Sequence, residues 1–296
     1  MKKYISVHFA ILYASFLLSS CVGYAPRSLL ILPDEPMSIN GMSYPSMEVL
    51  YKSDDKIVIV PSWGIVGKPG RYNQKIEIID NGGKILYSEE KKNVYIESNR
   101  FNCYAIPIND AIRGILSDGS KYTIKFYMND ELMLTQEGKY SDKNIVNSNI
   151  KNAVILPFEV LQEKQYFTSS EGLANRFSHP LFIEVKRVIP DTKPSHISKD
   201  VIGKPISIGC FTDNKCIDDL KEKFNNDVII GGKFELGESS MSISTLTVIV
   251  YNSKTNTIKK FIARESGSKM QFNLMFSDII RKLIYEEKIL QYLQEA

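Results

Sequence analysis

Histidine and tryptophan are scarce in this chain, whose 296 residues include three His and one Trp. Beyond the first twenty residues the histidines are His179 and His196, and neither has Cys, Asp or Glu at a spacing typical of metal ligands. We therefore expect surface histidines and no metal site. A complete Gly-x-Ser-x-Gly nucleophile signature is also absent, since Gly237-Glu-Ser-Ser lacks the closing glycine. The sequence predicts no catalytic residue and no cofactor, so we expect a protein that is not an enzyme.

Paired acids and glycines have structural interpretations. Asp54-Asp55 and Asp218-Asp219 are adjacent in the chain, so their side chains point in different directions and do not form facing acid–base couples. We expect Asp218 and Asp219 in the first turn of a short helix, where carboxylates favour the helix dipole. Gly231-Gly232 lies within a strand pattern, which indicates a bulge or a close approach to the backbone rather than a phosphate-binding loop.

The charge is nearly balanced, with 37 Lys and Arg against 34 Asp and Glu and a formal net charge of +3. No dense basic stripe is present, which excludes the electrostatic footprint of a nucleic-acid partner. Long apolar runs are equally rare. The only one of note lies at the amino terminus, so we expect a folded body tethered to a membrane at one end.

The amino terminus has the layout of a bacterial lipoprotein signal. Met1-Lys2-Lys3 is followed by an apolar run from Tyr4 to Leu18 and then by Leu18-Ser-Ser-Cys21. The apolar run, roughly fifteen residues, is shorter than the about twenty that a spanning helix needs. The pattern predicts a signal peptide over residues 1–20 and acylation (palmitate included) of Cys21. Because Val22 rather than aspartate follows, known sorting rules imply the outer membrane, with the body in the periplasm or on the cell surface.

Two alternatives remain for this segment. It could be an ordinary secretory signal in which the cysteine is incidental, or a single transmembrane anchor. Ser15, Ser19, Ser20 and Gly23 argue against the anchor, because they interrupt the apolar run.

The chain contains four cysteines. Besides Cys21, the pair Cys210 and Cys216 encloses the polar, turn-forming run Phe-Thr-Asp-Asn-Lys, which predicts a disulfide in an oxidising compartment. The alternative is a metal site, but two cysteines with no nearby His or third Cys make a poor zinc set. Cys103 lies in a strand-like segment, where we expect a buried thiol.

Composition, 43% hydrophobic and 24% charged, is that of a globular protein. Residues 21–43 are rich in Pro, Gly and Ser and predict an extended tether. Residues 44–142 contain about seven short strand-like segments, with hairpin signals at Asn81-Gly82 and Asn129-Asp130, and predict a β-sandwich. Gly119-Ser-Lys-Tyr-Thr-Ile resembles a pattern in the penultimate strand of small immunoglobulin-like modules of bacterial envelope proteins. Trp63 is either a core aromatic of this module or an exposed loop residue.

Residues 140–151 are polar and predict a linker, after which the pattern changes. Residues 152–293 alternate strand-like and helix-like segments, with a strand expected at Leu181–Ile189 and a final helix over roughly Phe272–Leu293. The predicted fold class is therefore α+β: an all-β immunoglobulin-like sandwich followed by an α+β domain with helices on a mixed sheet.

Four segments of this second region resemble the amino-terminal domain of the TolB translocation protein and the periplasmic body of the curli-secretion channel family. They are Ala153-Val-Ile-Leu-Pro-Phe, Cys210 to Cys216, Asn226-Asp-Val-Ile-Ile-Gly and the hairpin from Thr247 to Thr257. The resemblance covers residues 152–293, although Asn226 and Asn256 depart from the family pattern. It implies a non-enzymatic envelope component that binds protein partners or assembles with copies of itself.

These observations leave three functional hypotheses. The first is a lipid-anchored accessory or scaffold protein in the assembly or secretion of surface structures; short connections between strands favour this role over pore formation. The second is a glycan- or peptidoglycan-binding lipoprotein, since 16 Tyr and 14 Phe could supply stacking platforms. The third is an enzyme of unrecognised type.

Overall fold

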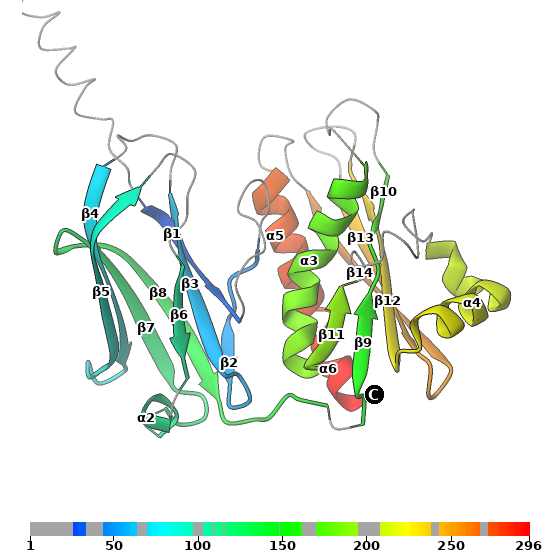
Figure 1. Cartoon of the computed structure of the whole chain (residues 1–296), viewed down its shortest axis with the longest axis horizontal. Coiled ribbons are helices and arrows are strands. Elements are labelled where there is room, and N and C mark those ends of the chain that lie inside the picture. The colour runs from blue at the N-terminus through cyan, green and yellow to red at the C-terminus, as the bar shows by residue number, and fades with distance from the viewer. Residues whose placement is uncertain are drawn as a thin grey trace, which may run out of the picture.

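The computed structural model describes residues 26–33, 44–63, 70–96, 103–108, 110–114, 116–147, 149–161, 170–194, 208–237, 243–266 and 272–296. They form two halves that stand side by side: an amino-terminal half with strands β1–β8 and a carboxyl-terminal half with elements β9–α6 (Figure 1). Strands dominate, and they form three sheets. The expected α+β class is therefore wrong: the described part of the protein is mostly β, with only a few helices.

The amino-terminal half contains two of these sheets. The three-stranded sheet has the order β1-β3-β6 and the five-stranded sheet the order β2-β8-β7-β4-β5. Side chains from both sheets, including Ile31, Ile57, Ile76 and Phe126, share one hydrophobic core. The elements are β1 Pro26–Leu32, β2 Val49–Tyr51, β3 Lys56–Trp63, β4 Gly70–Asp80, β5 Ile85–Ile96, β6 Tyr104–Pro107, α2 Asp110–Arg113, β7 Lys121–Met128 and β8 Glu131–Ser141.

Both predicted hairpins are present. Asp80 ends β4, and its Oδ1 accepts hydrogen bonds from the backbone N–H groups of Gly82 and Lys84. Asn129 and Asp130, both with positive φ, join β7 to β8. Two positive φ values suit a two-residue turn whose twist matches that of the strands, and both hairpin predictions are confirmed.

Strand β1 lies inside the stretch that the sequence predicted as a tether. It pairs antiparallel with β3, and Leu29, Ile31 and Leu32 are buried. Five prolines and glycines around it suggested extended, unpacked chain, but the run Leu29-Leu-Ile-Leu32 between them contributes enough apolar area to complete the three-stranded sheet. The chain between residue 21 and the folded body is therefore much shorter than expected.

The carboxyl-terminal half is built on a six-stranded sheet of order β11-β9-β12-β13-β14, with β10 paired to β12. Helices α3, α5 and α6 contribute to the core on one face of this sheet, and η2 with α4 to a smaller cluster on the other. The elements are β9 Asn152–Ile155, β10 Glu159–Leu161, α3 Ser170–Val188, β11 Asp191–Pro194, η2 Ile208–Thr212, α4 Asn214–Phe224, β12 Val228–Glu235, β13 Ile243–Asn252, β14 Thr257–Ser266, α5 Phe272–Tyr285 and α6 Ile289–Glu295.

The strand expected at Leu181–Ile189 is instead the second half of α3, which continues past Pro180. The side chains of this stretch are buried on more than one face: Leu181 and Val185 pack in the main core of the carboxyl-terminal half, while Ile183 packs against the amino-terminal half. A short, mostly apolar stretch that is buried on several sides of a helix fits a strand as well, so its sequence pattern does not distinguish the two.

The expected helix over Phe272–Leu293 is two helices. α5 ends at Tyr285, and α6 starts at Ile289 after Lys288, which has a positive φ of 56°. The exposed run Glu286-Glu-Lys288 interrupts the apolar spacing between Ile284 and Ile289, so the chain turns there and both helices keep their apolar side chains in the core.

The predicted linker is packed rather than loose. Asn147 is buried, and its Nδ2 donates hydrogen bonds to the carbonyl oxygens of Leu293 and Gln294 at the end of α6. Ile145 and Ile150 on either side of it belong to the carboxyl-terminal core. Among the described residues no helix is both long and apolar enough to cross a bilayer.

Candidate functional site: the junction between the two halves

The most heavily buried group of charges lies between the two halves and centres on Arg187 of α3. Its Nε and Nη2 donate to Oδ1 and Oδ2 of Asp54 at 3.0 and 2.8 Å, a two-point contact, and its Nη1 donates to Glu184 Oε2 at 2.7 Å. Nη2 also donates to the Val49 carbonyl at 2.7 Å. The three charged side chains are 3–4% exposed. We call this group the Arg187 clamp.

Local structure positions both sides of the clamp. Glu184 and Arg187 are three residues apart on α3, so they lie on one face of the helix. Asp54 sits in the turn between β2 and β3, where its backbone N–H donates to the Tyr51 carbonyl and its Oδ2 accepts from the Tyr51 N–H. Arg187 also lies over the Tyr51 ring, with its Cζ 5.2 Å from the ring centroid. One helix residue therefore fixes a whole turn of the other half.

Burial shifts the acid–base equilibria of the clamp. Burial raises the pKa of Glu184 above its ordinary value, and the Arg187 guanidinium offsets part of that rise. Burial alone would lower the pKa of Arg187, but the carboxylates of Glu184 and Asp54 outweigh it and raise this pKa well above its ordinary value. Burial likewise raises the pKa of Tyr51 and of Tyr285 nearby. The guanidinium thus stays charged at any physiological pH.

His179 forms a second contact between the halves, so the expectation of a surface histidine is wrong for it. His179 is 4% exposed, and its Nδ1 lies 3.0 Å from the hydroxyl of Tyr44, which is also buried. The sequence carries no signal for this burial, because the stretch that follows His179 is predicted as a strand rather than as part of a buried helix. His196 lies outside the described residues.

Apolar side chains surround these polar contacts. Leu32, Tyr44, Val58 and Val60 of the amino-terminal half form one buried cluster with Ile183 of α3. Further out, Tyr285 Oη accepts a hydrogen bond from the Glu48 N–H. Interfaces between loosely coupled domains are mostly polar, so the dry apolar cluster and the clamp together indicate a fixed arrangement of the halves.

A cavity of about 280 Å³ opens beside the clamp. It is slightly smaller than the roughly 300–1,000 Å³ usual for small-molecule sites. Both halves contribute to its wall, which consists of Pro33, Ser53, Asp54, Asp55, Lys56, Val146, Ile183, Lys186, Arg187 and Pro190.

The chemistry of the junction is structural. The guanidinium of Arg187 donates hydrogen bonds to two carboxylates and a carbonyl. Asp54 accepts hydrogen bonds from Arg187 and from the Tyr51 N–H. Within the described ranges, no three His, Cys, Asp or Glu side chains gather as ligands of a metal ion would. Asp54 and Asp55 point apart, as predicted, since Asp54 is buried and Asp55 exposed.

Sequence reasoning did not identify Arg187, Glu184 or Tyr44 as important. The only hint lay in the charged residues Glu184, Lys186 and Arg187 within a run whose other members are apolar. Charges in such a run are rarely buried without a partner, but nothing in the sequence indicates that the partner is Asp54.

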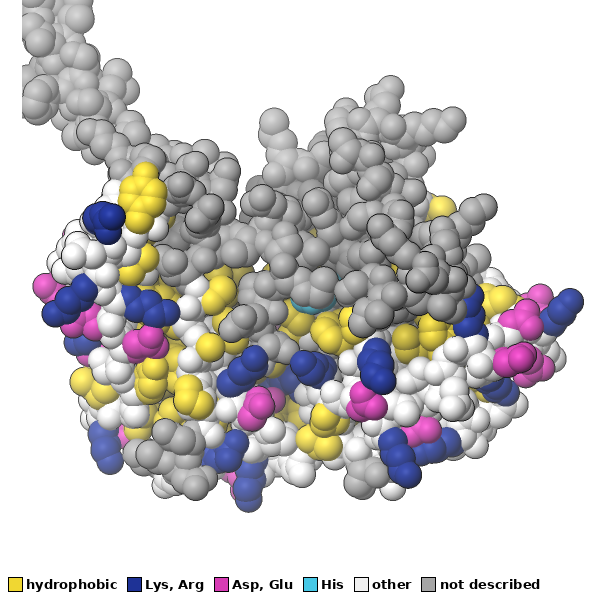
Figure 2. Space-filling view, in the orientation of Figure 1, with side chains coloured by type: hydrophobic (Ala, Val, Ile, Leu, Met, Phe, Trp, Pro, Cys, Tyr) yellow, Lys and Arg dark blue, Asp and Glu magenta, His cyan; other side chains and the backbone are white. Residues whose placement is uncertain are grey.

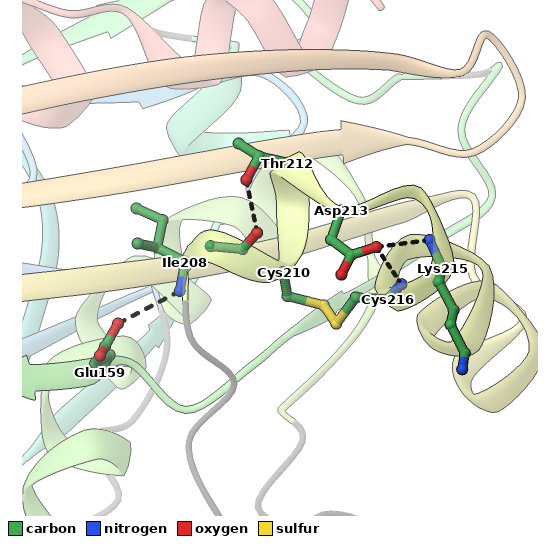
Figure 3. Close-up of a disulfide and its surroundings, with 8 residues drawn as sticks. Glu159, Ile208, Cys210, Thr212, Asp213, Lys215 and Cys216 are labelled. Atoms are coloured by element: carbon green, nitrogen blue, oxygen red, sulfur yellow. Dashed lines mark hydrogen bonds between the residues drawn. A yellow bond between two sulfur atoms is a disulfide. The ribbon is translucent and has the colours of Figure 1, made fainter.

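The cysteine predictions have different outcomes. Cys210 and Cys216 form a disulfide with a Cα–Cα distance of 5.2 Å, joining the middle of η2 to the first turn of α4 (Figure 3). Cys103 lies immediately before β6 as a thiol and is half-buried rather than fully buried. Cys21 lies outside the described residues, so its acylation stays a prediction.

We expect the double substitution Cys210→Ser and Cys216→Ser to lower the free energy of unfolding by about 2 kcal/mol, because the closed loop is short and restricts the unfolded chain only moderately. Denaturant titration of the purified protein measures this loss. Reduction of the wild-type protein with dithiothreitol should give the same shift, and an unchanged midpoint in both experiments would show that the bond adds no stability.

Helix α4 begins earlier than predicted. Asp213 is its N-cap, with Oδ1 accepting from the N–H groups of Lys215 and Cys216. Asp218 and Asp219 therefore lie beyond the first turn, and the role expected for them at the helix start belongs to Asp213, while Cys216 of the disulfide lies inside the helix (Figure 3).

Close packing of aromatic rings on β12 accounts for its two glycines. A Cβ on Gly231 would overlap the ring of Phe211, and one on Gly232 would lie 2.7 Å from Phe158 Cδ1. Each glycine lets an aromatic ring lie directly on the sheet, on opposite faces. The predicted close approach to the backbone is confirmed.

Comparison with known proteins does not assign a family. No protein-family model and no curated protein matches the chain. The resemblance to the TolB and curli-secretion families stays a prediction.

Several solved structures show local similarity. The hypothetical protein CT253 from Chlamydia trachomatis is 12% identical and covers 50% of this chain and 99% of its own, with a TM-score of 0.31. Lipoprotein GNA1162 from Neisseria meningitidis is 11% identical and covers 45% and 96%, with a TM-score of 0.30. The immunoglobulin-like protein PA1606 from Pseudomonas aeruginosa is 9% identical and covers 39% and 98%, with a TM-score of 0.25. A lipoprotein and an immunoglobulin-like protein are thus among the structural neighbours, but TM-scores of this size carry no argument about fold or function.

Proposed function

We propose that this chain is a lipid-anchored envelope protein that acts as an accessory or scaffold component, through protein–protein contacts, in the assembly or secretion of surface structures. The observation that carries the proposal is the junction. The Arg187 clamp and the apolar cluster around Ile183 hold the halves in one fixed arrangement. A scaffold needs fixed spacing between its contact surfaces, whereas a hinged two-domain binder needs a weak, wet interface.

The location rests on two features of the chain. The leader up to Cys21 has the layout of a lipoprotein signal. The Cys210–Cys216 disulfide fits a protein that folds in an oxidising compartment outside the cytoplasm.

Exposed apolar side chains supply candidate contact surfaces. Ile243 of β13 and Ile258 of β14 are 60% and 46% exposed. Register places them on the same face as Tyr251 and Ile262, the face opposite the main helical core. Elsewhere acidic, basic and hydrophobic side chains are interspersed over the face shown in Figure 2. Ile243 and Ile258 lie eight residues apart along the β13–β14 ladder, so they mark two separate exposed aliphatic positions, either of which could lie within a contact with another protein.

The exposed side chains support glycan binding less well than protein–protein contact. Sugar stacking needs exposed aromatic rings. Among the described residues, the large hydrophobic side chains that are exposed are aliphatic except for Tyr95. The tyrosine and phenylalanine platforms that the composition suggested are mostly in the cores, with Tyr104, Tyr122, Phe126 and Phe158 fully buried.

The anchoring part of the proposal predicts the outcome of Cys21→Ser. This variant is expected to accumulate as a precursor that retains residues 1–20 and carries no acyl chains, because the thiol that receives the lipid is gone. Mass spectrometry of the membrane fraction measures both properties. Cys103→Ser is the matched control and should mature normally. A Cys21→Ser protein that matures to wild-type size and stays membrane-bound contradicts lipidation at this position.

The scaffold part is tested by site-specific photo-crosslinking in intact cells. A crosslinking residue at Ile258 should yield discrete protein adducts, whereas one at Glu222, on the exposed side of α4, should yield none. Retention of the protein on the insoluble cell wall, without discrete protein adducts, would favour the glycan-binding alternative.

A further inference from the structure

Strand β1 is fixed firmly in the body. Its register places Pro26 opposite Trp63 and Leu32 opposite Val58. Leu29, Ile31 and Leu32 are at most 2% exposed, and the Ile31 N–H donates to Ser46 Oγ. Detaching β1 would expose these side chains, so the strand cannot be released to lengthen the chain that leads to it.

The chain that precedes β1 is correspondingly short. From Cys21 to Pro26 there are five Cα–Cα steps, which span at most about 17 Å when fully extended. A tether that ran to residue 43, as the sequence suggested, would have reached roughly 75 Å. An acyl-bearing Cys21 lies at the level of the lipid headgroups, so the start of β1 lies within about 17 Å of that level, which is less than half the roughly 40–45 Å thickness of a whole bilayer.

Other strand ends lie at this same end of the amino-terminal half. Gly70 pairs with Ile96, and Arg71 with Tyr95, where β4 begins and β5 ends (Figure 1). Tyr95 is 52% exposed, and Arg71 is exposed with its Nη1 donating to the Asn93 carbonyl. Tyrosine and arginine are residues that settle at a membrane–water interface, with the ring among the headgroups and the charge in water.

The charges nearby decide which kind of contact is possible. Lys92 on β5 and Asp130 and Glu131 near the β7–β8 turn are all exposed, so among the described side chains the basic and acidic groups around Arg71 balance. These described charges therefore supply no net attraction to anionic lipid. The short tether keeps this end of the protein close to the bilayer, and the preference of Tyr95 for the membrane–water interface favours contact with the headgroups.

We propose that this end of the amino-terminal half, marked by Pro26, Arg71 and Tyr95, is a membrane-facing surface whose partner is the headgroup layer of the lipid bilayer. The inference rests on the acylation of Cys21 in the proposed function. It gives the protein a defined orientation: the β4–β5 turn faces away from the membrane, and so does the end of the carboxyl-terminal half that holds α6 (Figure 1).

The fluorescence of Trp63 can report this orientation. Trp63 is the single tryptophan of the chain, and its backbone pairs with that of Pro26. The acylated full-length protein, purified in detergent, is reconstituted into phosphatidylcholine vesicles that contain a lipid with a nitroxide on its headgroup. We expect Trp63 fluorescence to fall by about two-fold, since the tether keeps this end within about 17 Å of the labelled layer. The fall should be the same at low and high salt.

A matched variant moves the probe to the opposite end. Trp63→Phe combined with Asn81→Trp places the tryptophan in the exposed β4–β5 turn, and its fluorescence should not change with the labelled lipid. Equal quenching of the two probes, or no quenching of Trp63 in a protein whose mass shows acyl chains, would overturn the orientation and leave the proposed function standing. A mass without acyl chains would overturn both.

Discussion

Substitution of Arg187 by methionine is expected to lower the free energy of unfolding by about 3–5 kcal/mol, since it leaves buried carboxylates without their counter-charge. Asp54 and Glu184 are 4% and 3% exposed at their side chains and share this one guanidinium. Methionine keeps most of the side-chain volume, so the loss reflects charge and hydrogen bonding rather than a cavity. Urea titration followed by circular dichroism measures it.

The same variant should respond to pH in a defined direction. The folded-state pKa of Glu184 already lies above its ordinary value of 4.5, and removing Arg187 raises it further, because the guanidinium is the group that lowers it. An acid with a raised folded-state pKa binds more protons when folded, so stability falls as pH rises through the interval between the unfolded and folded values. The deficit of Arg187→Met relative to wild type should therefore be smallest near the ordinary pKa of the acid and largest above the raised one.

Two further variants make this prediction decisive. Arg281→Met removes an exposed arginine that pairs with Glu48 and Glu286, and it should cost at most about 1 kcal/mol. Adding Glu184→Gln to Arg187→Met should restore part of the lost stability at neutral pH. A loss of the same size for Arg187 and Arg281, independent of pH, would mean that the clamp does not hold the halves together.

The second large loss of stability is expected on truncation of Phe211 of η2. Its ring lies over Gly231 and fills the hydrophobic cluster between the sheet and α4. Phe211→Ala is expected to lower the free energy of unfolding by about 3–5 kcal/mol, because the ring is 1% exposed and its removal leaves a cavity on the bare glycine. Denaturant titration measures the loss, and Phe224→Ala, a half-buried phenylalanine of α4, should cost less.

A double-mutant cycle tests the contact itself. Gly231→Val alone should cost about 1–3 kcal/mol by overpacking against the ring. In the Phe211→Ala background the same valine has room and fills part of the cavity, so the double variant should be more stable than the sum of the two losses predicts. Strict additivity would contradict direct packing of the ring on the strand.

The elements that the sequence predicted well are those specified by neighbouring residues. Hairpins at Asn81-Gly82 and Asn129-Asp130, the close approach at Gly231-Gly232 and the Cys210–Cys216 bond each depend on a few adjacent positions. Turn geometry and short loops are local properties, so sequence alone carries them.

The elements that it missed depend on distant parts of the chain. The strand predicted at Leu181–Ile189 is a helix, since its second apolar face is used by the other half. β1 was assigned to a tether, because its partner β3 follows only after a long stretch of polar and turn-forming residues. Likewise Asp54 and Arg187 are separated by 133 positions, and no local pattern links them. Long-range pairing of this kind formed the junction and added β1 to its sheet.

Helix α3 couples the two halves into a single cooperative folding unit. Leu181 and Val185 complete one core, while Ile183 closes the cluster of Leu32, Val58 and Val60 on the other. The amino-terminal half is synthesised first and leaves these side chains uncovered until α3 is available. The two halves should therefore melt in one transition, and neither should accumulate as a stable fragment when expressed alone.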